Sequence, residues 1–219
     1  MSTSWASPEW SPAFITRNNL RPALLLASQS PRRKEILKFI GVPFRVVKPL
    51  GVRENPRKNE SPRALVLRLA LAKAKSVSRR FPGHRVLGAD TVVASRGKIF
   101  GKPKDRREAA KMLMALQNRP HEVWTGVALV GPEGNRPKAS AEKTTVYFKP
   151  LSLAQVASYL NSKEPYDKAG GYNIQGTARA WVEKWEGDYF NVVGLPVGLV
   201  LRLLNRLNPG EARGKGRGI

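Results

Sequence analysis

The sequence contains no cysteine, only two histidines and few acidic residues. Without cysteine the chain cannot form a disulfide, a thiolate zinc site, an iron–sulfur cluster or a cysteine nucleophile. With His84 and His121 as its only histidines, it cannot build a metal site from several imidazoles. Any bound metal would therefore be a hard cation held by oxygen atoms.

Long hydrophobic segments are also missing. The longest apolar stretches are residues 23–27 and 197–204, and Arg202 interrupts the second. Both are too short to cross a bilayer as a helix. The N-terminal residues lack the basic and apolar regions of a secretory signal. We therefore expect a cytoplasmic protein that does not insert into a membrane.

Positive charge is abundant. The 219 residues include 39 Lys+Arg and 16 Asp+Glu, which gives a formal net charge of +23, and 41% of the residues are hydrophobic, enough for a folded core. The densest basic region is residues 53–80, where the only acidic residues are Glu54 and Glu60. A compositional bias, a phosphate-containing substrate or a nucleic acid would each account for this charge. Because no zinc finger, basic zipper or RNA-recognition motif is present, a nucleic-acid partner is not favoured.

Hydrophobic patterning predicts strands that alternate with helices early in the chain and pair as hairpins later. Apolar runs predict strands at residues 23–27, 44–47, 86–93, 123–130, 143–148 and 181–185, with a short return strand around Ile99. Capping residues and apolar stripes predict helices at residues 31–40, 61–80, 105–116, 153–160 and 195–207. The fold class is therefore α/β with a mixed sheet. We expect residues 1–21 to form a flexible extension, 22–208 one domain, and 209–219 a basic, glycine-rich, disordered tail.

The first candidate site is the turn from the first strand into the first helix. Ser30 is suited to cap this helix and Pro31 to begin it. A helix N-terminus offers free N–H groups and partial positive charge to an anion. Ser28, Ser30, Arg32 and Arg33 can all donate hydrogen bonds to phosphate oxygens. The alternative is an ordinary capped helix with two surface arginines.

The second candidate is Asp90, a carboxylate inside an apolar strand. Burying it is costly unless it has a partner, so it could bind Mg²⁺, activate water or cap a neighbouring turn. Glu54 could share a metal or a water with Asp90, although a solvated glutamate is the simpler interpretation.

Two lysines and a glycine-rich loop complete the candidates. Lys73 on a predicted helix and Lys102 in a Gly-Lys-Pro loop could each face phosphate or solvent. In residues 166–176, Gln175 is suited to a pyrimidine edge, and Tyr172 either stacks on a base or packs within the loop. Residues 188–196 are interpreted as a structural link. Walker A and G-x-G-x-x-G motifs are absent, and neither histidine lies in a Ser-His-Asp context.

Six motifs in order resemble the Maf family of nucleoside triphosphate pyrophosphatases. The resemblance covers about residues 23–207 and rests on ASQSPRRKEIL, GADTVV, GKP, HEVWTGVAL, YDKAGGYNIQG and NVVGLPV. It implies the inosine triphosphate pyrophosphatase-like (Maf/Ham1) fold, an elongated mixed sheet with flanking helices and two lobes around a cleft. The implied reaction is hydrolysis of a nucleoside triphosphate to the monophosphate and pyrophosphate, with Mg²⁺ or Mn²⁺ as cofactor, in an enzyme that is often a homodimer.

The resemblance also implies roles for individual residues. Asp90 matches the proposed catalytic base, and Glu54 matches an acidic residue that, with Asp90, is the best candidate to bind the metal. Phosphate binding is implied for Ser28, Ser30, Arg32, Arg33, Lys73 and Lys102. Base specificity is implied for Arg32, Thr91 and Gln175.

The loop KAGGYNIQG resembles the branch of the family that acts on dTTP and UTP. Gly171 and Asn173 depart from this branch, which more often has Ala and Gly there. Two alternatives remain: a regulator of septum formation in cell division, and a basic nucleic-acid-binding protein with little turnover.

Overall fold

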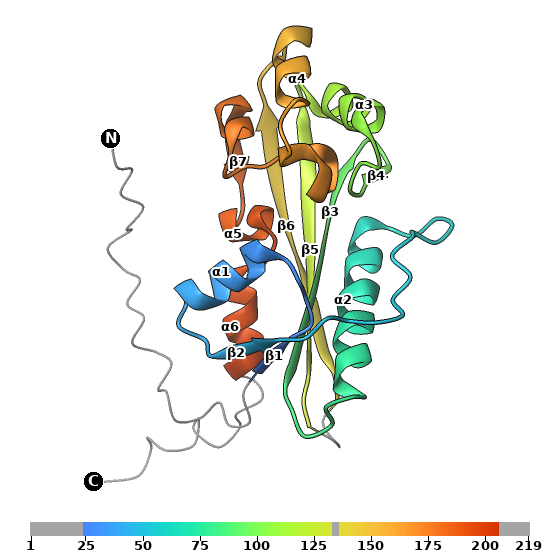
Figure 1. Cartoon of the computed structure of the whole chain (residues 1–219), viewed down its shortest axis with the longest axis vertical. Helices are drawn as coiled ribbons and strands as arrows, with labels where there is room; N and C mark the ends of the chain where they lie inside the picture. Colours follow the sequence, from blue (N-terminus) through green and yellow to red (C-terminus); the bar gives the residue numbers. More distant parts are fainter. Residues whose placement is uncertain (1–23, 133–135, 206–219) are drawn as a thin grey trace, which may run out of the picture.

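The computed structural model describes residues 24–132 and 136–205 (Figure 1). The predicted extension at residues 1–21 and the predicted tail at 209–219 lie outside these residues. The strands are β1 Leu24–Leu26, β2 Phe44–Val46, β3 Val86–Ser95, β4 Lys98–Phe100, β5 Pro120–Val130, β6 Lys138–Phe148 and β7 Val182–Glu186. The helices are α1 Pro31–Phe39, α2 Pro62–Ser78, α3 Arg106–Leu116, α4 Leu153–Tyr159, α5 Tyr189–Val193 and α6 Val197–Asn205, with 3₁₀ turns η2 Glu164–Asp167, η3 Ala169–Gly171 and η4 Thr177–Trp181.

A single mixed sheet connects all seven of these strands. Its order is β2-β1-β3-β5-β6-β7, with β4 attached to β3. The β1–β2 and β1–β3 pairs are parallel, and the other pairs are antiparallel. The α/β class with a mixed sheet, predicted from the alternation of apolar runs and helical stripes, is confirmed.

Strand β3 divides the molecule into two lobes because different strands pair with its two ends. β1 pairs with its first residues, as far as Leu87, and β4 pairs with its last residues, from Val93. Between these positions, no strand among the described residues pairs with this edge of β3. The lower lobe in Figure 1 holds α1, α2 and α6, and the upper lobe holds α3, α4 and β7. Asp90 and Thr91 lie in the open stretch between the lobes.

Helix α2 lies against one face of the sheet at very short range. A Cβ atom at Gly88 would stand 2.2 Å from the carbonyl oxygen of Ala70, and one at Gly126 would stand 2.3 Å from that of Val66. Both glycines are therefore required for this packing. Successive strand residues face opposite sides, so Asp90 shares the α2 face with Gly88, and Thr91 faces the other side.

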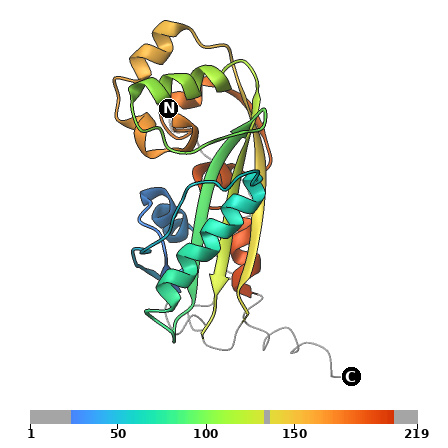
Figure 2. The same ribbon diagram turned by 90° about the vertical axis from the view of Figure 1, so that its right-hand side faces the viewer.

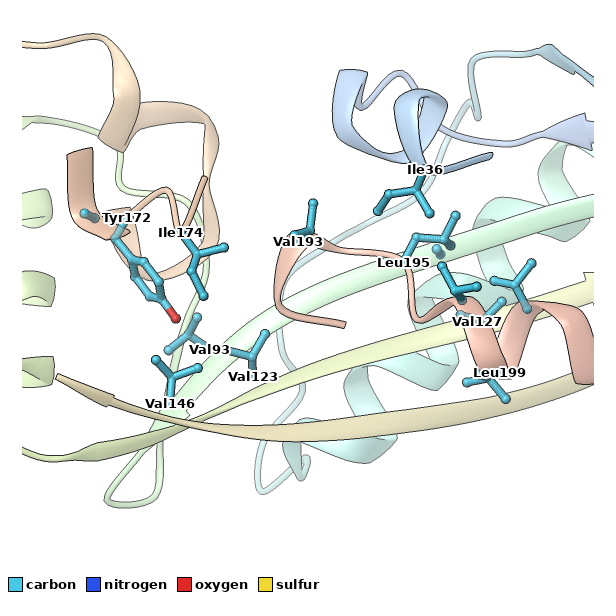
Figure 3. Packing of buried hydrophobic residues seen from close by; sticks show 14 of the residues in the cluster. Ile36, Val93, Val123, Val127, Val146, Tyr172, Ile174, Val193, Leu195 and Leu199 are labelled. Carbon is cyan, nitrogen blue, oxygen red and sulfur yellow. The ribbon is translucent and has the colours of Figure 1, made fainter. Parts of the chain in front are cut away.

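The opposite face of the sheet carries the largest hydrophobic cluster. Figure 3 shows its two ends: Tyr172 and Ile174 lie near Val93 and Val146, while Ile36 and Leu195 lie near Val127. Helices α1 and α6 contribute to this cluster, whereas α2 packs in separate clusters on its own face. The long strands β3, β5 and β6 run through both lobes and join them (Figure 2).

The structure shifts several predicted boundaries. The hairpin strands begin earlier, at Pro120 and Lys138, because their ladder continues without a break from Pro120–Tyr147 to Leu129–Lys138. The last helix starts at Val197 rather than residue 195, because the Leu195 N–H donates to the carbonyl of Phe190 in α5 and so belongs to the end of the preceding helix. Helix α5 itself is not predicted. No helix in the described part of the chain has the length and apolar character needed to cross a bilayer.

Candidate active site

A cleft of about 810 Å³ opens at the free edge of β3. Both lobes line it: α1, α2 and the segment after β2 from one side, and the β4–α3 region and the 167–174 loop from the other. Its lining includes four carboxylates and six cations, the latter Arg32, Arg33, Lys48, Lys73, Lys102 and Lys168. The charge of these cations suits a polyanionic ligand.

The turn from β1 into α1 forms one wall of the cleft. Ser30 is the N-cap residue and Pro31 begins the helix as predicted, but the Ser30 side chain makes no capping hydrogen bond. The buried Ser28 Oγ accepts hydrogen bonds from the Ser30 N–H at 3.2 Å and from Arg33 Nη1 at 3.1 Å. Because Ser28 accepts both bonds, its own hydroxyl proton remains able to donate into the cleft.

Arg33 is buried and held at three of its nitrogens. Nε donates to the carbonyl of Gly194 at 2.9 Å, and Nη2 donates to Thr91 Oγ1 at 3.1 Å, in addition to the Nη1 bond to Ser28. A guanidinium has five N–H donors, so two remain for a ligand. Arg33 is therefore a fixed cation at the cleft wall and not a mobile surface side chain.

The bond to Thr91 continues into a directed chain of hydroxyls. Thr91 Oγ1 lies 3.0 Å from Thr125 Oγ1, and Thr125 Oγ1 donates to the carbonyl of Asn191 at 3.0 Å. Because the single proton of Thr125 goes to Asn191, Thr91 must donate to Thr125. The order of donation is thus Arg33 to Thr91 to Thr125 to Asn191. The sequence predicts neither this series of hydrogen bonds nor the participation of Thr125 in it.

Lys73 joins the two predicted acidic residues. Its Nζ lies 2.6 Å from Asp90 Oδ1 and 2.6 Å from Glu54 Oε1. The side chains of Lys73 and Asp90 are each 10% exposed, whereas that of Glu54 is 59% exposed. The apolar face of α2 thus carries one buried lysine because a buried carboxylate on β3 stands opposite it. The solvent-facing alternative for Lys73 is excluded.

The two carboxyl groups differ in electrostatic environment. Burial raises the pKa of Asp90, and the nearby Lys73 and Arg33 oppose that rise only in part. Burial acts to raise the pKa of Glu54, but the hydrogen bond and charge of Lys73, together with the charges of Lys102 and Arg33, outweigh it, so the pKa of Glu54 is lowered. A carboxylate with a raised pKa beside an ionised one is an arrangement suited to accepting a proton.

The donor set can be compared with what a divalent metal requires. The described residues hold no group of three or more His, Cys, Asp or Glu side chains that could bind a metal by themselves. Glu54 and Asp90, however, each contact the same ammonium group through one oxygen, so the two carboxyl groups lie close together in the cleft and each keeps a second oxygen. Mg²⁺ is commonly held by one or two carboxylates together with substrate phosphates, and this pair fits that mode of binding.

The far wall supplies further charged groups. Lys102 lines the cleft, is exposed, and helps to lower the pKa of Glu54. Arg32 on α1 reaches across to Asp167 on η2, with Nη1 and Oδ2 3.4 Å apart, and Asp167 is also paired with Lys168. The sequence contains Asp167 and Lys168 just before Ala169 and the paired glycines, yet neither is predicted as a site residue. The sequence feature that could have identified them is a pair of opposite charges next to each other in a glycine-rich loop.

The glycine-rich loop has a buried side and an exposed side. Tyr172 is buried, and its hydroxyl lies 2.9 Å from His121 Nε2, so the structure supports packing rather than base stacking. Gln175 is exposed and does not line the cleft, and its role in base specificity stays a prediction. Asn173 lines the cleft instead, because its Oδ1 accepts the backbone N–H of Gln175 and the loop turns there. All other predicted site residues line one cleft: Ser28, Ser30, Arg32, Arg33, Glu54, Lys73, Asp90, Thr91 and Lys102.

Comparison with known proteins identifies related sequences over most of the chain. The model of the family described as Maf-like protein matches residues 23–207. A protein of Symbiobacterium thermophilum named dTTP/UTP pyrophosphatase is 50% identical over 183 residues, which are 84% of this chain and 93% of that protein. A protein of Carboxydothermus hydrogenoformans with the same name is 46% identical over 181 residues, 83% of this chain and 96% of that protein.

Among solved structures, the Ham1 protein of Staphylococcus aureus has a similar fold. Its TM-score is 0.51 at 12% sequence identity, over 84% of this chain and 99% of that chain. At this identity the likeness concerns the fold alone, and it confirms the expected Maf/Ham1 architecture.

Proposed function

This chain belongs to the family of Maf-like proteins, and we propose that it hydrolyses dTTP and UTP to the nucleoside monophosphate and pyrophosphate. Relatives named dTTP/UTP pyrophosphatase support the substrates. The observation that carries the proposal is Asp90, a buried carboxylate at the open edge of β3, facing a cleft lined by six cations.

The triphosphate binds at the wall formed by the start of α1. The first-turn N–H groups of this helix and the hydroxyls of Ser28 and Ser30 donate to phosphate oxygens. Arg33 presents its two remaining N–H donors, while Arg32 exchanges its 3.4 Å contact with Asp167 for phosphate. Lys73 and Lys102 neutralise the negative charge that grows on the departing pyrophosphate.

A divalent cation, Mg²⁺ or Mn²⁺, completes the proposed site, with Glu54 and Asp90 as its protein ligands. When bound with the substrate, such a cation polarises phosphate oxygens and offsets their charge. The lowered pKa of Glu54 keeps that carboxylate ionised and available as a ligand.

Asp90 takes the proton of the attacking water. Its raised pKa makes it a stronger proton acceptor than an exposed aspartate, and Lys73 keeps it ionised in the free enzyme. The water oxygen forms a bond to the α-phosphorus, the bond from that phosphorus to the bridging oxygen breaks, and pyrophosphate leaves. The specificity roles of Arg32, Thr91 and Gln175 stay predictions, and for Gln175 the loop must turn the side chain inward.

Pyrophosphate release from a nucleotide panel tests the proposal. The panel holds dTTP, UTP, CTP, 7-methylguanosine triphosphate and the common purine triphosphates, each with Mg²⁺ or Mn²⁺. Asp90→Asn keeps the shape of the side chain but not its basicity, so we expect turnover of dTTP and UTP to fall by at least about 100-fold. Full turnover in this variant would exclude Asp90 as the base, and turnover of purine triphosphates alone would exclude the proposed substrates.

Two properties outside the cleft stay predictions. Homodimerisation is tested by light scattering of the purified chain, and the cytoplasmic location by fractionation of cells that express it.

A further inference from the structure

One face of the molecule carries basic side chains that the proposed reaction does not use. They belong to the segment after β2 and to α2, and we call them the basic band. Its members are all exposed: Arg53, Arg57, Lys58, Arg63, Lys75 and Arg79. None of them lines the cleft.

The segment after β2 runs along α2 in the opposite direction, which brings the cations of the two elements into one region. The Leu50 N–H donates to Ser76 Oγ near the end of the helix, at 3.3 Å. Glu54 pairs with Lys73 in the middle of α2, and the carbonyl of Asn55 accepts from Arg68 Nη2 closer to the helix start, at 3.1 Å. Figure 2 shows this segment crossing beside α2 on the side that faces the viewer. The cations of this segment thus lie beside α2, on the side of the molecule that this helix covers.

Glu60 is the acidic residue nearest the band: it accepts the backbone N–H of Arg57 at 3.0 Å, and the two side-chain charges attract each other. The only acidic residues between positions 36 and 89 are Glu54 and Glu60. Glu54 is bound to Lys73, and Glu60 is bound to Arg68 through two contacts of 2.6 and 2.7 Å. Within the residues that the structure describes, none of the six band cations is paired with a carboxylate.

We propose that the basic band binds the sugar–phosphate backbone of a nucleic-acid strand without reading its sequence. Arg63 in the first turn of α2 and Arg79 directly after its end are sixteen residues apart, which corresponds to about 24 Å along the helix, longer than a nucleoside triphosphate. Four of the six cations are arginines, whose planar donors bind phosphate in pairs. Helix α2 contains no aromatic residue on which bases could stack, so the recognition is electrostatic.

An anionic membrane is a poorer fit to this face. Such binding needs apolar side chains beside the cations. Of the exposed large hydrophobic residues in the described chain, only Leu50 lies here, whereas Phe39 and Val46 belong to α1 and β2.

Salt-dependent binding to a defined strand tests the proposal. The probe is an oligoadenylate RNA of about 20 nucleotides with a 5′-hydroxyl end and a 3′ fluorophore, read by anisotropy. It carries neither a triphosphate nor a pyrimidine, the two features that the proposed substrates present to the cleft. The triple variant R63Q/K75Q/R79Q should bind at least about tenfold more weakly at low salt. Its slope of log K against log salt should be shallower by about 2, since each phosphate contact contributes about 0.7 for a single strand.

The control variant removes the same number of positive charges from the upper lobe. The triple variant R107Q/K149Q/K163Q removes three exposed cations of the upper lobe and should bind the RNA within about twofold of the parent. Equal weakening in both triples, or no binding by the parent protein, would overturn the proposal. Binding to phosphatidylserine vesicles in place of RNA would also overturn it.

The outcome is independent of the proposed catalysis, because none of the substituted residues lines the cleft. Both triples should therefore keep the kcat of the parent protein for dTTP. Band-dependent RNA binding by a protein that releases no pyrophosphate would support this inference and contradict the proposed function.

Discussion

Lys73 controls the ionisation of the residue that we propose as the base. Its ammonium lies 2.6 Å from Asp90, whose pKa is raised by burial and held back by Lys73 and Arg33. Replacing Lys73 with Met removes a cation that favours the ionised carboxylate, so the pKa of Asp90 must rise further. The acidic limb of the pH profile of kcat/KM for dTTP, which reports the free enzyme, should move to higher pH.

Lys75→Met is the matched control, because Lys75 is exposed on the same helix two residues away. A variant at Lys73 with lower activity but an unshifted acidic limb would mean that Lys73 contacts substrate without tuning Asp90.

Thr125 is proposed to position Arg33 through Thr91. Thr125→Val keeps the shape of the side chain but leaves the Thr91 hydroxyl without its acceptor, which weakens the bond that orients Arg33 Nη2. Losing one buried hydrogen-bond partner costs about 1–3 kcal/mol, so we expect kcat/KM for dTTP to fall about tenfold or more.

Thr125→Ser restores the hydroxyl and should restore kcat/KM, a rescue that a merely structural role of the methyl group would not produce. Thr145→Val is the control: it removes a hydroxyl of β6 that takes no part in the hydrogen bonds from Arg33 to Asn191, so it should leave kcat/KM unchanged. If Thr125→Ser did not recover kcat/KM, the Thr125 hydroxyl would not be the group that positions Arg33.

At the scale of elements, the sequence predicts most helices and strands because their signals are local. Ser61 and Asp105 cap α2 and α3 through their side chains as their positions predict. Helix α5 is not predicted because its five residues are too few to show a helical repeat, and its cap residue Asp188 is equally typical of a turn. The extension of β5 and β6 depends on cross-strand pairing, which a single segment does not reveal.

The candidate site was predictable where side chains act from regular elements. Asp90, Arg33 and Lys73 stand on β3, α1 and α2, which the sequence predicts, and these elements bring all three to one cleft. Gln175 lies two residues after Asn173 in an irregular loop. The direction of the Gln175 side chain depends on the hydrogen bond from its backbone N–H to Asn173 Oδ1, which hydrophobic periodicity does not predict. The pairing of Arg32 with Asp167 spans the two lobes and is likewise visible only in the folded chain.

Close packing of α2 on the sheet depends on Gly126. A Cβ atom there would stand 2.3 Å from the backbone oxygen of Val66, which no side-chain rotation can relieve. Gly126→Ala should therefore lower the free energy of unfolding by about 3 kcal/mol, or the Tm by about 10 °C. Gly83→Ala is the control, because nothing lies within 4 Å of the added atom. Equal Tm values for the two variants would show that α2 can move away from β5 without a loss of stability.

At the scale of the whole molecule, two lobes share one set of long strands. β3, β5 and β6 cross the cleft region, so the lobes are not separate domains joined by a linker. His121 on β5 contacts Tyr172, the residue after η3, and packs edge-on against Phe148; both aromatic residues belong to the core cluster that both lobes contribute to. Protonation of His121 should therefore affect the global stability of the fold as well as the nearby loop.

Burial lowers the pKa of His121 to about 4, from 6.5. Above pH 6.5 neither the folded nor the unfolded chain is protonated at this residue, so its contribution to stability is complete. As the pH falls from 6.5 toward 4, the unfolded chain binds the proton first, and about 3 kcal/mol of the free energy of unfolding is lost. Urea unfolding across this pH range measures the loss, and His121→Gln should flatten it, with the same substitution at His84 as the control. If the parent and His121→Gln lost stability with the same slope, the acid sensitivity would belong to other groups, and His121 would contribute only by its packing.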